Sequence, residues 1–306
     1  MTACLVCLSD AGEDEYHPAC VRGLFGVPRP PALDVDLARI HTLGLAMAGR
    51  ASISGVQRKV SLGLAVDRQT LQVATAGARY ILKPQAGTFP YLPENEHVTM
   101  KMAALFGLDV PACGLLRLND RSLAYIVERF DRPREGGKRR QEDFCQLAEF
   151  SPKQKYEGSA ELCVRLVRRY ASEPGIATLA LFRLLVFGWW TGNGDMHLKN
   201  VSLLAGADGR QYLSPAYDLL CTRLVIPDDP LALPVDARRD RLDRATWMRF
   251  SAYARLPTAA AARVLDLPGQ TLAAAEDLCQ RSYLPDEYKA AYVALLRARA
   301  GVLAMA

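Results

Sequence analysis

The chain has 306 residues and a formal net charge of +5, and half of its residues are hydrophobic while 23% are charged. It is long enough for two lobes with a substantial core, and its composition is ordinary for a soluble globular protein. The mild positive charge permits an acidic partner without requiring nucleic acid. The most apolar segment, residues 179–190, contains Arg183 and is too short to span a bilayer, so we expect no membrane contact.

The amino terminus has no basic segment followed by an apolar region, so no secretory leader is predicted. The eight cysteines are scattered along the chain, and several lie in apolar periodic segments. This usage favours buried thiols in a reducing compartment over a disulfide framework. We therefore expect a cytoplasmic location.

The first half of the chain is predicted to be rich in strands. Residues 1–50 are mixed in pattern and contain a proline-rich break at residues 27–31. Apolar alternation then predicts strands over residues 60–66, 71–74, 79–82, 115–118 and 123–128. A helix is predicted over residues 94–106, because Pro93 precedes it, acidic residues occupy its first turn and Gly107 follows it.

Helical periodicity dominates the second half. It predicts helices over residues 161–170, 175–190, 244–254, 258–265 and 285–298, and short strands over residues 201–204 and 211–213. The charged segment 133–140 is interpreted as an exposed loop between the halves. This order predicts an α+β, bilobal, protein-kinase-like fold: an N-terminal segment (1–50), a small β-rich N-lobe (51–130) and a larger, mainly α-helical C-lobe (131–306).

The most informative segment is Gly-Asn-Gly-Asp-Met-His-Leu-Lys-Asn at residues 192–200. Asp195 stands five residues before Asn200, and a predicted hairpin then leads to Asp218. That order suits metal-assisted phosphoryl transfer, with Asp195 orienting an attacking hydroxyl while Asn200 and Asp218 hold Mg²⁺ on the triphosphate. The spacing of an Asp and an Asn is common by chance, so the interpretation depends on further parts.

Further parts of a kinase can be sought in the N-lobe. Lys83 ends a predicted strand and could reach the phosphates, although an edge-strand lysine that extends to solvent is an open alternative. Glu96 is the preferred carboxylate partner of this lysine, and Glu94 is also possible. The segment 52–59 could cover the phosphates, but it holds a single glycine and is weak evidence by itself. Glu128 and Phe130, at a strand end, could offer backbone groups to adenine.

Together these motifs resemble the HipA family of bacterial serine/threonine kinase toxins, over roughly residues 50–250. The matching motifs are Ser-Ile-Ser-Gly-Val-Gln-Arg-Lys (52–59), Ile-Leu-Lys-Pro (81–84), Glu-Asn-Glu-His (94–97), Glu-Arg-Phe-Asp-Arg (128–132), Gln-Glu-Asp-Phe-Cys-Gln (141–146), the 192–200 segment and Ser-Pro-Ala-Tyr-Asp (214–218). The resemblance implies an ATP-dependent protein kinase in which Asp195 is the catalytic base, Asn200 and Asp218 bind magnesium and Lys83 binds ATP.

The resemblance also implies a wider set of ATP-site residues. They are Ser54, Gly55, Val56, Gln57, Arg58 and Lys59 in the covering loop, Glu128, Arg129 and Phe130 in the hinge, and His197, Leu198, Lys199, Asn200, Tyr217 and Asp218 in the C-lobe. Ser52 falls at the family's autophosphorylated serine, and Ser54 gives the form seen in the short HipT-like branch. A phosphate on either serine would repel ATP or pair with nearby cations.

Partners are implied by the resemblance as well. Only 51 residues precede Ser52, fewer than in long HipA proteins. We therefore expect a toxin–antitoxin system with a small HipS-like protein and a helix-turn-helix, HipB-like antitoxin in trans, and an aminoacyl-tRNA synthetase as the protein substrate. No direct sequence-specific nucleic acid binding is expected. The alternatives are a small-molecule phosphotransferase and a catalytically silent binding scaffold.

A separate signal lies near the amino terminus. Cys4, Cys7, His17 and Cys20 have a spacing that could bind Zn²⁺ tetrahedrally. The alternative is a short helix within residues 16–25 that buries Cys20 together with its apolar neighbours. A zinc site here would hold the amino terminus in place and leave catalysis elsewhere.

Overall fold

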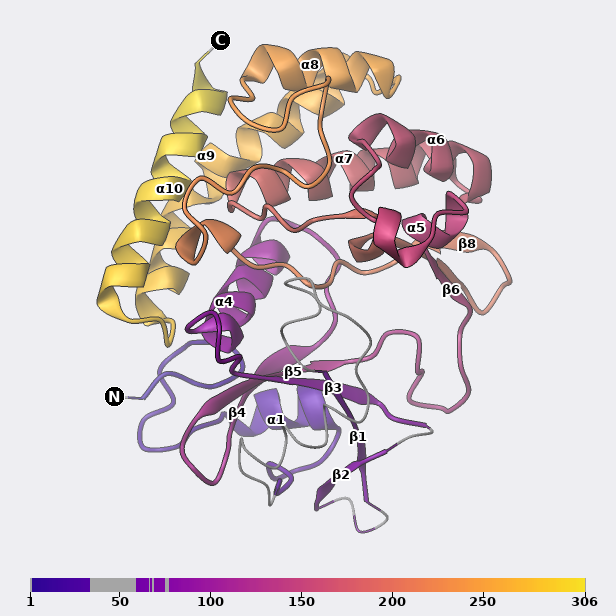
Figure 1. Cartoon of the computed structure of the whole chain (residues 1–306). Coiled ribbons are helices and arrows are strands. Elements are labelled where there is room, and N and C mark those ends of the chain that lie inside the picture. Colours follow the sequence, from indigo (N-terminus) through magenta and orange to yellow (C-terminus); the bar gives the residue numbers. More distant parts are fainter. Residues whose placement is uncertain (1, 34–58, 66, 68, 75–76, 306) are drawn as a thin grey trace.

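The computed structural model describes residues 2–33, 59–65, 67, 69–74 and 77–305. Figure 1 shows a sheet-rich lobe and a helical lobe, with helix α4 (Leu92–Leu105) between them. The strands are β1 (Val60–Leu64), β2 (Leu71–Val73), β3 (Tyr80–Pro84), β4 (Cys113–Arg117), β5 (Leu123–Glu128), β6 (Gln141–Asp143), β7 (Ser202–Ala205) and β8 (Gln211–Leu213). The other helices are α1 (Pro18–Phe25), α5 (Phe144–Leu147), α6 (Ala160–Tyr170), α7 (Pro174–Trp190), α8 (Arg244–Tyr253), α9 (Thr258–Arg281) and α10 (Asp286–Ala304).

The five-stranded sheet has the order β2-β1-β3-β5-β4, with antiparallel neighbours and β3 at its centre. Successive side chains of a strand point to opposite faces. In β5, Ala124 and Ile126 therefore join the core on one face, and Tyr125 and Val127 join the core on the other. Because both faces are covered, this strand is apolar at nearly every position.

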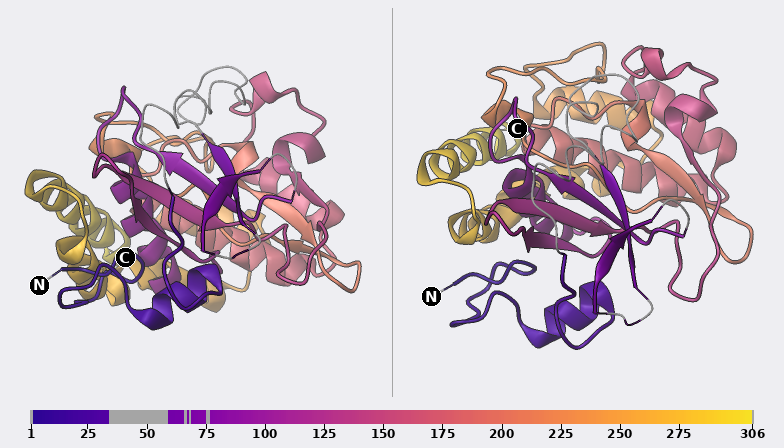
Figure 2. Two further views of the ribbon diagram at one scale, coloured as in Figure 1. Left: turned by 90° about the horizontal axis from the view of Figure 1, so that it is seen from below. Right: turned by 60° about the horizontal axis from the view of Figure 1, so that its bottom comes forward.

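Helix α1 covers one face of the sheet, on the side away from the helical lobe (Figure 2). Its buried residues Val21, Leu24 and Phe25 pack into the same core cluster as the sheet, and the ring of Phe25 lies 5.6 Å from that of Tyr80. The helix ends at Gly26, whose φ of 68° is the left-handed conformation that glycine adopts without strain.

Helix α4 joins the opposite face of the sheet to the helical lobe. It begins at Leu92, two residues before the predicted start, so Pro93 lies inside the first turn, where its missing N–H costs nothing. Asn95 forms two hydrogen bonds across the lobes, donating to the carbonyl oxygen of Cys221 at 2.9 Å and accepting from its N–H at 2.8 Å. Both residues are buried, so α4 is fixed to the segment that follows Asp218.

Helix α7 is the centre of the helical lobe. Eleven of its 17 residues are buried, and it packs against α6, α9 and α10. Its apolar sequence is thus explained by burial among helices on several sides. Among the described residues, no helix combines the length and apolar character needed to cross a membrane.

Two helices extend well beyond their predicted ends. The pattern predicts a helix over residues 258–265, but α9 continues to Arg281 with Pro268 buried inside it. A proline weakens an isolated helix, but α9 packs against α4, α7, α8 and α10, and this packing supports the longer helix. Helix α10 likewise extends to Ala304 instead of ending at residue 298.

Strand β6 has no sequence signal of its own. Its three residues are polar or charged, so no apolar alternation marks them. The strand forms because its backbone pairs with β7, with Gln141 opposite Leu204 and Asp143 opposite Ser202. This pairing places β6 beside residues 198–200, at the end of the 192–200 loop.

Replacing Asn95 with alanine should destabilise the protein by about 1–3 kcal/mol, because the buried N–H of Cys221 loses its partner while the carbonyl oxygen keeps the 3.3 Å bond from the N–H of Leu224. Urea unfolding measures this change in the free energy of unfolding. The matched control is Leu105→Ala on the same helix, whose side chain is already 40% exposed and whose loss should cost about 1 kcal/mol or less. Equal losses for the two variants would contradict the proposed link between the lobes.

Candidate active site

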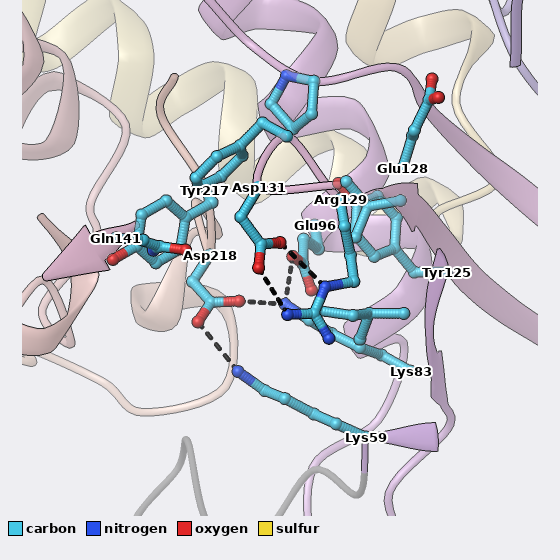
Figure 3. Close-up of a pocket in the computed structure, with 14 residues that line it drawn as sticks. Lys59, Lys83, Glu96, Tyr125, Glu128, Arg129, Asp131, Gln141, Tyr217 and Asp218 are labelled. Atoms are coloured by element: carbon cyan, nitrogen blue, oxygen red, sulfur yellow. Dashed lines mark hydrogen bonds and ion pairs between the residues drawn. The ribbon is translucent and has the colours of Figure 1, made fainter. Parts of the chain in front are cut away.

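A cleft lies where the sheet lobe faces the helical lobe (Figure 3). It contains a cavity of about 150 Å³ beside a second of about 350 Å³. The residues that line both cavities are Lys59, Arg129, Asp131, Gln141, Tyr217 and Asp218. Most of the sequence-predicted ATP-site residues within the described part of the chain line one of these cavities.

Lys83 reaches the cleft from the central strand β3. Its side chain is 4% exposed, and its ammonium group lies 2.5 Å from the carboxylate of Glu96 and also contacts Asp218. This position excludes the alternative of an edge-strand lysine that extends to solvent. Burial lowers the pKa of Lys83, but the carboxylates of Asp218 and Glu96 outweigh burial and raise it, so the ammonium group stays charged. The carboxylate of Glu94 instead has a buried oxygen without a partner among the described residues.

Asp218, on the helical lobe, forms ion pairs with two lysines of the sheet lobe. Its carboxylate pairs with Lys83 and, at 2.9 Å, with Lys59, and it accepts a hydrogen bond from the amide of Asn200 at 3.3 Å. Burial raises the pKa of Asp218, but the charges of Lys59 and Lys83 outweigh burial and hold the pKa far below its usual value. Asp218 is therefore ionised at neutral pH.

The loop of residues 191–200 carries Asp195 and Asn200 out of the end of α7. Gly192 has a φ of 76°, and a Cβ at Gly194 would collide with the carboxylate of Asp229. Both glycines thus permit the tight path of this loop. Asp195 is 9% exposed and accepts a hydrogen bond of 2.5 Å from the hydroxyl of Tyr156.

The protonation of Asp195 reflects opposing effects. Burial raises its pKa, while the hydrogen bond from Tyr156 and the charge of Lys155 lower it. The net direction is upward from the usual value of an aspartate. A carboxylate with a raised pKa is a stronger proton acceptor, which is the property that a general base requires.

His197 organises the same loop in its neutral form. Burial and the nearby charge of Lys155 lower its pKa to about 3. The ammonium group of Lys155 donates to Nε2 at 2.7 Å, and the backbone N–H of His197 donates to Oδ1 of Asn200 at 3.1 Å. Within the described residues Nδ1 of His197 is buried without a partner, and the side chain lines the larger cavity. The neutral imidazole therefore links Lys155 to the loop that carries Asn200.

The remaining predicted C-lobe positions have different roles. Lys199 lines the larger cavity and lies 3.3 Å from Asp143. Tyr217 borders both cavities, and its hydroxyl bonds to Ser202 and to the carbonyl oxygen of Lys199. Leu198 instead buries its side chain in the core. Its side chain lines neither cavity.

The predicted hinge residues line the smaller cavity, but most of their polar groups are already engaged. The carboxylate of Glu128 pairs with Arg79 and Arg134, and the guanidinium of Arg129 forms two hydrogen bonds to Asp131. Their backbone N–H groups donate to the carbonyl oxygens of neighbouring segments at 2.8 Å. Phe130 is the remaining hinge position for a backbone donor to adenine.

The predicted covering loop lies mostly outside the described residues. Of the residues assigned to it, Ser52, Ser54, Gly55, Val56, Gln57 and Arg58 are not described, whereas Lys59 is described and pairs with Asp218. Sequence reasoning missed Lys155 and Tyr156. They lie on a connecting segment with no recognisable motif, and their contacts to the 192–200 loop become visible only in the folded chain.

The donor atoms of the cleft suit Mg²⁺ and a polyphosphate. Asn200 and Asp218 carry the amide and carboxylate oxygens that Mg²⁺ prefers, and the amide oxygen of Asn200 also accepts the N–H of His197. Lys59 and Lys83 place ammonium groups beside the same carboxylate, where phosphate oxygens would find cations. The residues present therefore fit the cofactors expected from the sequence.

A family model described as the HipA-like C-terminal domain matches residues 51–295. The chain belongs to this HipA-like family. Two curated relatives carry the name "Putative kinase": Y4mE of Sinorhizobium fredii, 35% identical over 214 residues, and a Haemophilus influenzae protein, 29% identical over 203 residues. The matches cover 66% and 62% of this chain, but 50% and 59% of those relatives, so the HipA-like chain spans little more than half of their length.

Solved structures show the same fold. The HipA toxin of Shewanella oneidensis MR-1, solved as a complex of HipA, HipB and operator DNA, matches with a TM-score of 0.72 and 24% identity, over 83% of this HipA-like chain and 66% of that one. The Helicobacter pylori proinflammatory kinase CtkA matches with a TM-score of 0.55 and 13% identity, over 73% and 86% of the two chains. The predicted family and the predicted kinase-like α+β fold are confirmed.

Replacing Tyr156 with phenylalanine should raise the pKa of Asp195 further, because the carboxylate loses the hydroxyl donor that favours its charged form. Carbon-13 NMR titration of the aspartate carboxyl groups, assigned with Asp195→Asn, measures the shift. The matched control is Tyr212→Phe, which removes a comparable Tyr–Asp bond of 2.7 Å on an exposed hairpin and should leave Asp195 unchanged. A fall in the pKa of Asp195 would contradict the assignment of Tyr156 as its donor.

Proposed function

We propose that the chain is an ATP-dependent serine/threonine protein kinase. The observation that carries the proposal is the contact of Asp218 with Asn200 and with the Lys83–Glu96 ion pair in one cleft, while Asp195 lies on the same loop as Asn200. These are the parts that positioning and electrostatic stabilisation of a transferred phosphoryl group require. Membership of a family with kinase-named relatives and kinase-like structures supports the same conclusion.

In this proposal each side chain has one task. Lys83, held by Glu96, orients phosphate oxygens of ATP, and Asn200 and Asp218 hold the magnesium ion. Bound Mg²⁺ would neutralise charge that develops on the transferred phosphoryl group. Asp195 accepts the proton of the attacking hydroxyl. Because Tyr156 occupies Oδ1 of Asp195, the acceptor hydroxyl would be held by Oδ2.

The surroundings of the catalytic loop favour a protein acceptor over a small cationic one. A cavity of about 680 Å³ is lined by residues 192–194, immediately before Asp195, together with four arginines and four aspartates. With equal numbers of opposite charges, this cavity of the described residues differs from the acidic pocket that a cationic small molecule needs. Such a surface suits an extended polypeptide with mixed charges, which favours a protein hydroxyl as the acceptor.

The biological setting is part of the same proposal. We infer a toxin of a toxin–antitoxin system that phosphorylates an aminoacyl-tRNA synthetase and autophosphorylates at Ser52 or Ser54. A HipB-like antitoxin and a HipS-like protein would act as partners in trans. The Shewanella oneidensis structure, in which HipA is accompanied by HipB, supports an antitoxin partner.

Asp195→Asn should lower the rate of phosphoryl transfer by about 10²- to 10⁴-fold, because the general base is lost while the residues proposed to bind ATP and Mg²⁺ remain. Intact mass spectrometry of protein incubated with Mg²⁺-ATP would show one added phosphoryl group on the wild type and none on the variant. The double variant Ser52→Ala, Ser54→Ala should also lack the addition. Asp208→Asn, on the exposed hairpin, is the matched control and should behave as wild type. Transfer at the wild-type rate by Asp195→Asn would exclude its role as base.

Lys83→Met should weaken ATP binding by about 10- to 100-fold, as expected for the loss of a charge-assisted hydrogen bond worth about 1.5–3 kcal/mol. Isothermal titration calorimetry measures the change, and thermal denaturation verifies that the variant is folded. The matched control is Lys289→Met on α10. Lys289 lines neither cavity of the cleft, so this change should leave the affinity for ATP unaltered. Equal affinities of Lys83→Met and wild type would contradict the contact between Lys83 and the phosphates.

A further inference from the structure

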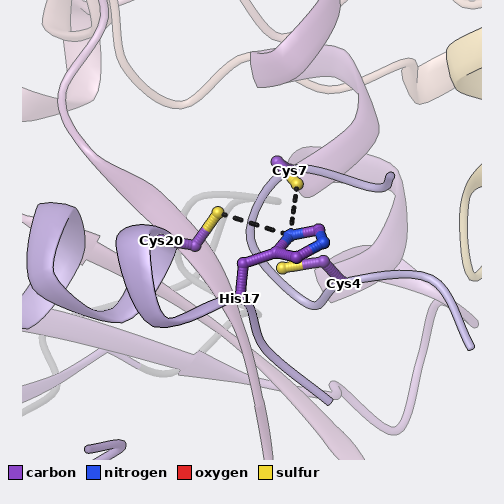
Figure 4. Close-up of side chains that lie close together, drawn as sticks. All are labelled: Cys4, Cys7, His17 and Cys20. Atoms are coloured by element: carbon purple, nitrogen blue, oxygen red, sulfur yellow. Dashed lines mark hydrogen bonds between the residues drawn. The ribbon is translucent and has the colours of Figure 1, made fainter. Parts of the chain in front are cut away.

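Four potential metal ligands meet on the sheet lobe, and none of them lines the two cavities of the ATP cleft (Figure 4). The thiols of Cys4, Cys7 and Cys20 and a ring nitrogen of His17 all lie within 4.8 Å of one another. Cys4 is buried, and the other three are partly exposed. The cluster is therefore enclosed on one side and open to an ion from solvent on the other.

The local backbone brings the first two thiols together. Residues 3–10 form a tight loop that is closed by a bridge between Ala3 and Asp10 and by a hydrogen bond of 2.7 Å from the N–H of Cys4 to Ser9. Within it the N–H of Val6 points at Sγ of Cys4 at 3.5 Å. Such N–H groups stabilise thiolates that bind a metal.

The start of α1 supplies the other two ligands. His17 is the residue before the helix, and Cys20 lies in its first turn. Spaced three residues apart at a helix end, they face the Cys4–Cys7 loop together. The structure corrects the alternative in which the helix buries Cys20: α1 buries Val21, Leu24 and Phe25, and Cys20 turns toward His17.

The imidazole of His17 is oriented as metal-binding histidines are. Its Nε2 lies 2.9 Å from the carbonyl oxygen of Asp10, which can only accept, so Nε2 carries the proton. In the neutral ring Nδ1 then offers a lone pair, and it lies 3.3 Å from Sγ of Cys7 and 3.9 Å from Sγ of Cys20. A carbonyl that holds the far nitrogen of a ligating histidine is the usual outer support of a zinc site.

We propose that Cys4, Cys7, His17 and Cys20 bind one Zn²⁺ ion as a closed structural site. Tetrahedral zinc with these ligand types requires separations of about 3.5–3.8 Å between ligand atoms, so a small contraction of the observed cluster suffices. Four protein ligands leave no open position for a substrate, which assigns the ion a structural role. A disulfide between two of the three cysteines would leave the third sulfur of the cluster without a covalent partner, whereas zinc would bind all three.

The loop that carries the first two ligands contacts both lobes. The carbonyl oxygen of Val6 accepts a hydrogen bond of 3.0 Å from His97 on α4, and the carbonyl oxygen of Leu5 accepts one of 2.7 Å from the N–H of Leu115 on β4. On the helical side, Arg281 at the end of α9 donates to the carbonyl oxygen of Leu8 at 3.0 Å. Zinc would therefore fasten the amino terminus to α4, β4 and α9 at once.

The metal content of the protein, purified without chelators, tests the proposal directly. We expect inductively coupled plasma mass spectrometry to find one zinc ion per chain. Replacement by Co²⁺ should give the visible bands of a tetrahedral site and a sulfur-to-cobalt absorption band. Cys20→Ser should reduce that band by about a third, because one of three thiolates is lost. The matched control is Cys145→Ser, a buried thiol outside the cluster, which should retain zinc and the full band.

Thermal denaturation gives a second readout that does not depend on kinase activity. Removal of zinc from the wild type should lower Tm by about 5 °C or more, and added Zn²⁺ should restore it. If Cys20→Ser fails to fold, the wild-type metal content and cobalt spectrum still decide the question. Wild-type protein without zinc and without a sulfur-to-cobalt band would overturn the proposal, as would a disulfide among these cysteines.

Discussion

The structure depends on a buried ion cluster in which Lys83 from β3, Glu96 from α4 and Asp218 from the helical lobe come into contact. Burying charges costs several kcal/mol for each ion unless they are paired, so none of the three can be withdrawn alone without a large penalty. Lys59 adds a second cation to Asp218 from a more exposed position. The cluster therefore fixes the distance between the lobes and concentrates cations where phosphate oxygens would lie.

Packing around this cluster explains why it can persist. The sheet buries one face against α1 and the other against α4. The hydrophobic core on the α4 side continues without interruption into the helical lobe. Asn95 adds a neutral link one residue before Glu96, since its amide pairs with both backbone groups of Cys221. The lobes are thus joined by apolar contacts, by a polar pair and by charges, and all three involve α4.

Sequence patterns predicted those parts whose signal is local. The strand Leu123–Glu128 matches the predicted residues, and Lys83 and Asp218 were found from motifs that short segments define. Contacts between distant segments have no such signal, and this is why Tyr156, which reaches Asp195 across 39 positions, was missed. The end of α9 was misplaced for a related reason: the packing that lets the helix continue through Pro268 comes from four other helices.

Helix α4 connects the amino-terminal cluster to the cleft. Consecutive helix residues point about 100° apart, so Glu96 can face Lys83 while His97 faces the Cys4–Cys7 loop. Burial and the charge of Lys101 lower the pKa of His97 to about 3, so it donates to Val6 as a neutral ring across the physiological range. A rotation or shift of α4 that separated Glu96 from Lys83 would also break this hydrogen bond. The amino-terminal loop therefore resists the same movement that would open the ion cluster, and the order of that loop bears on the geometry of the cleft.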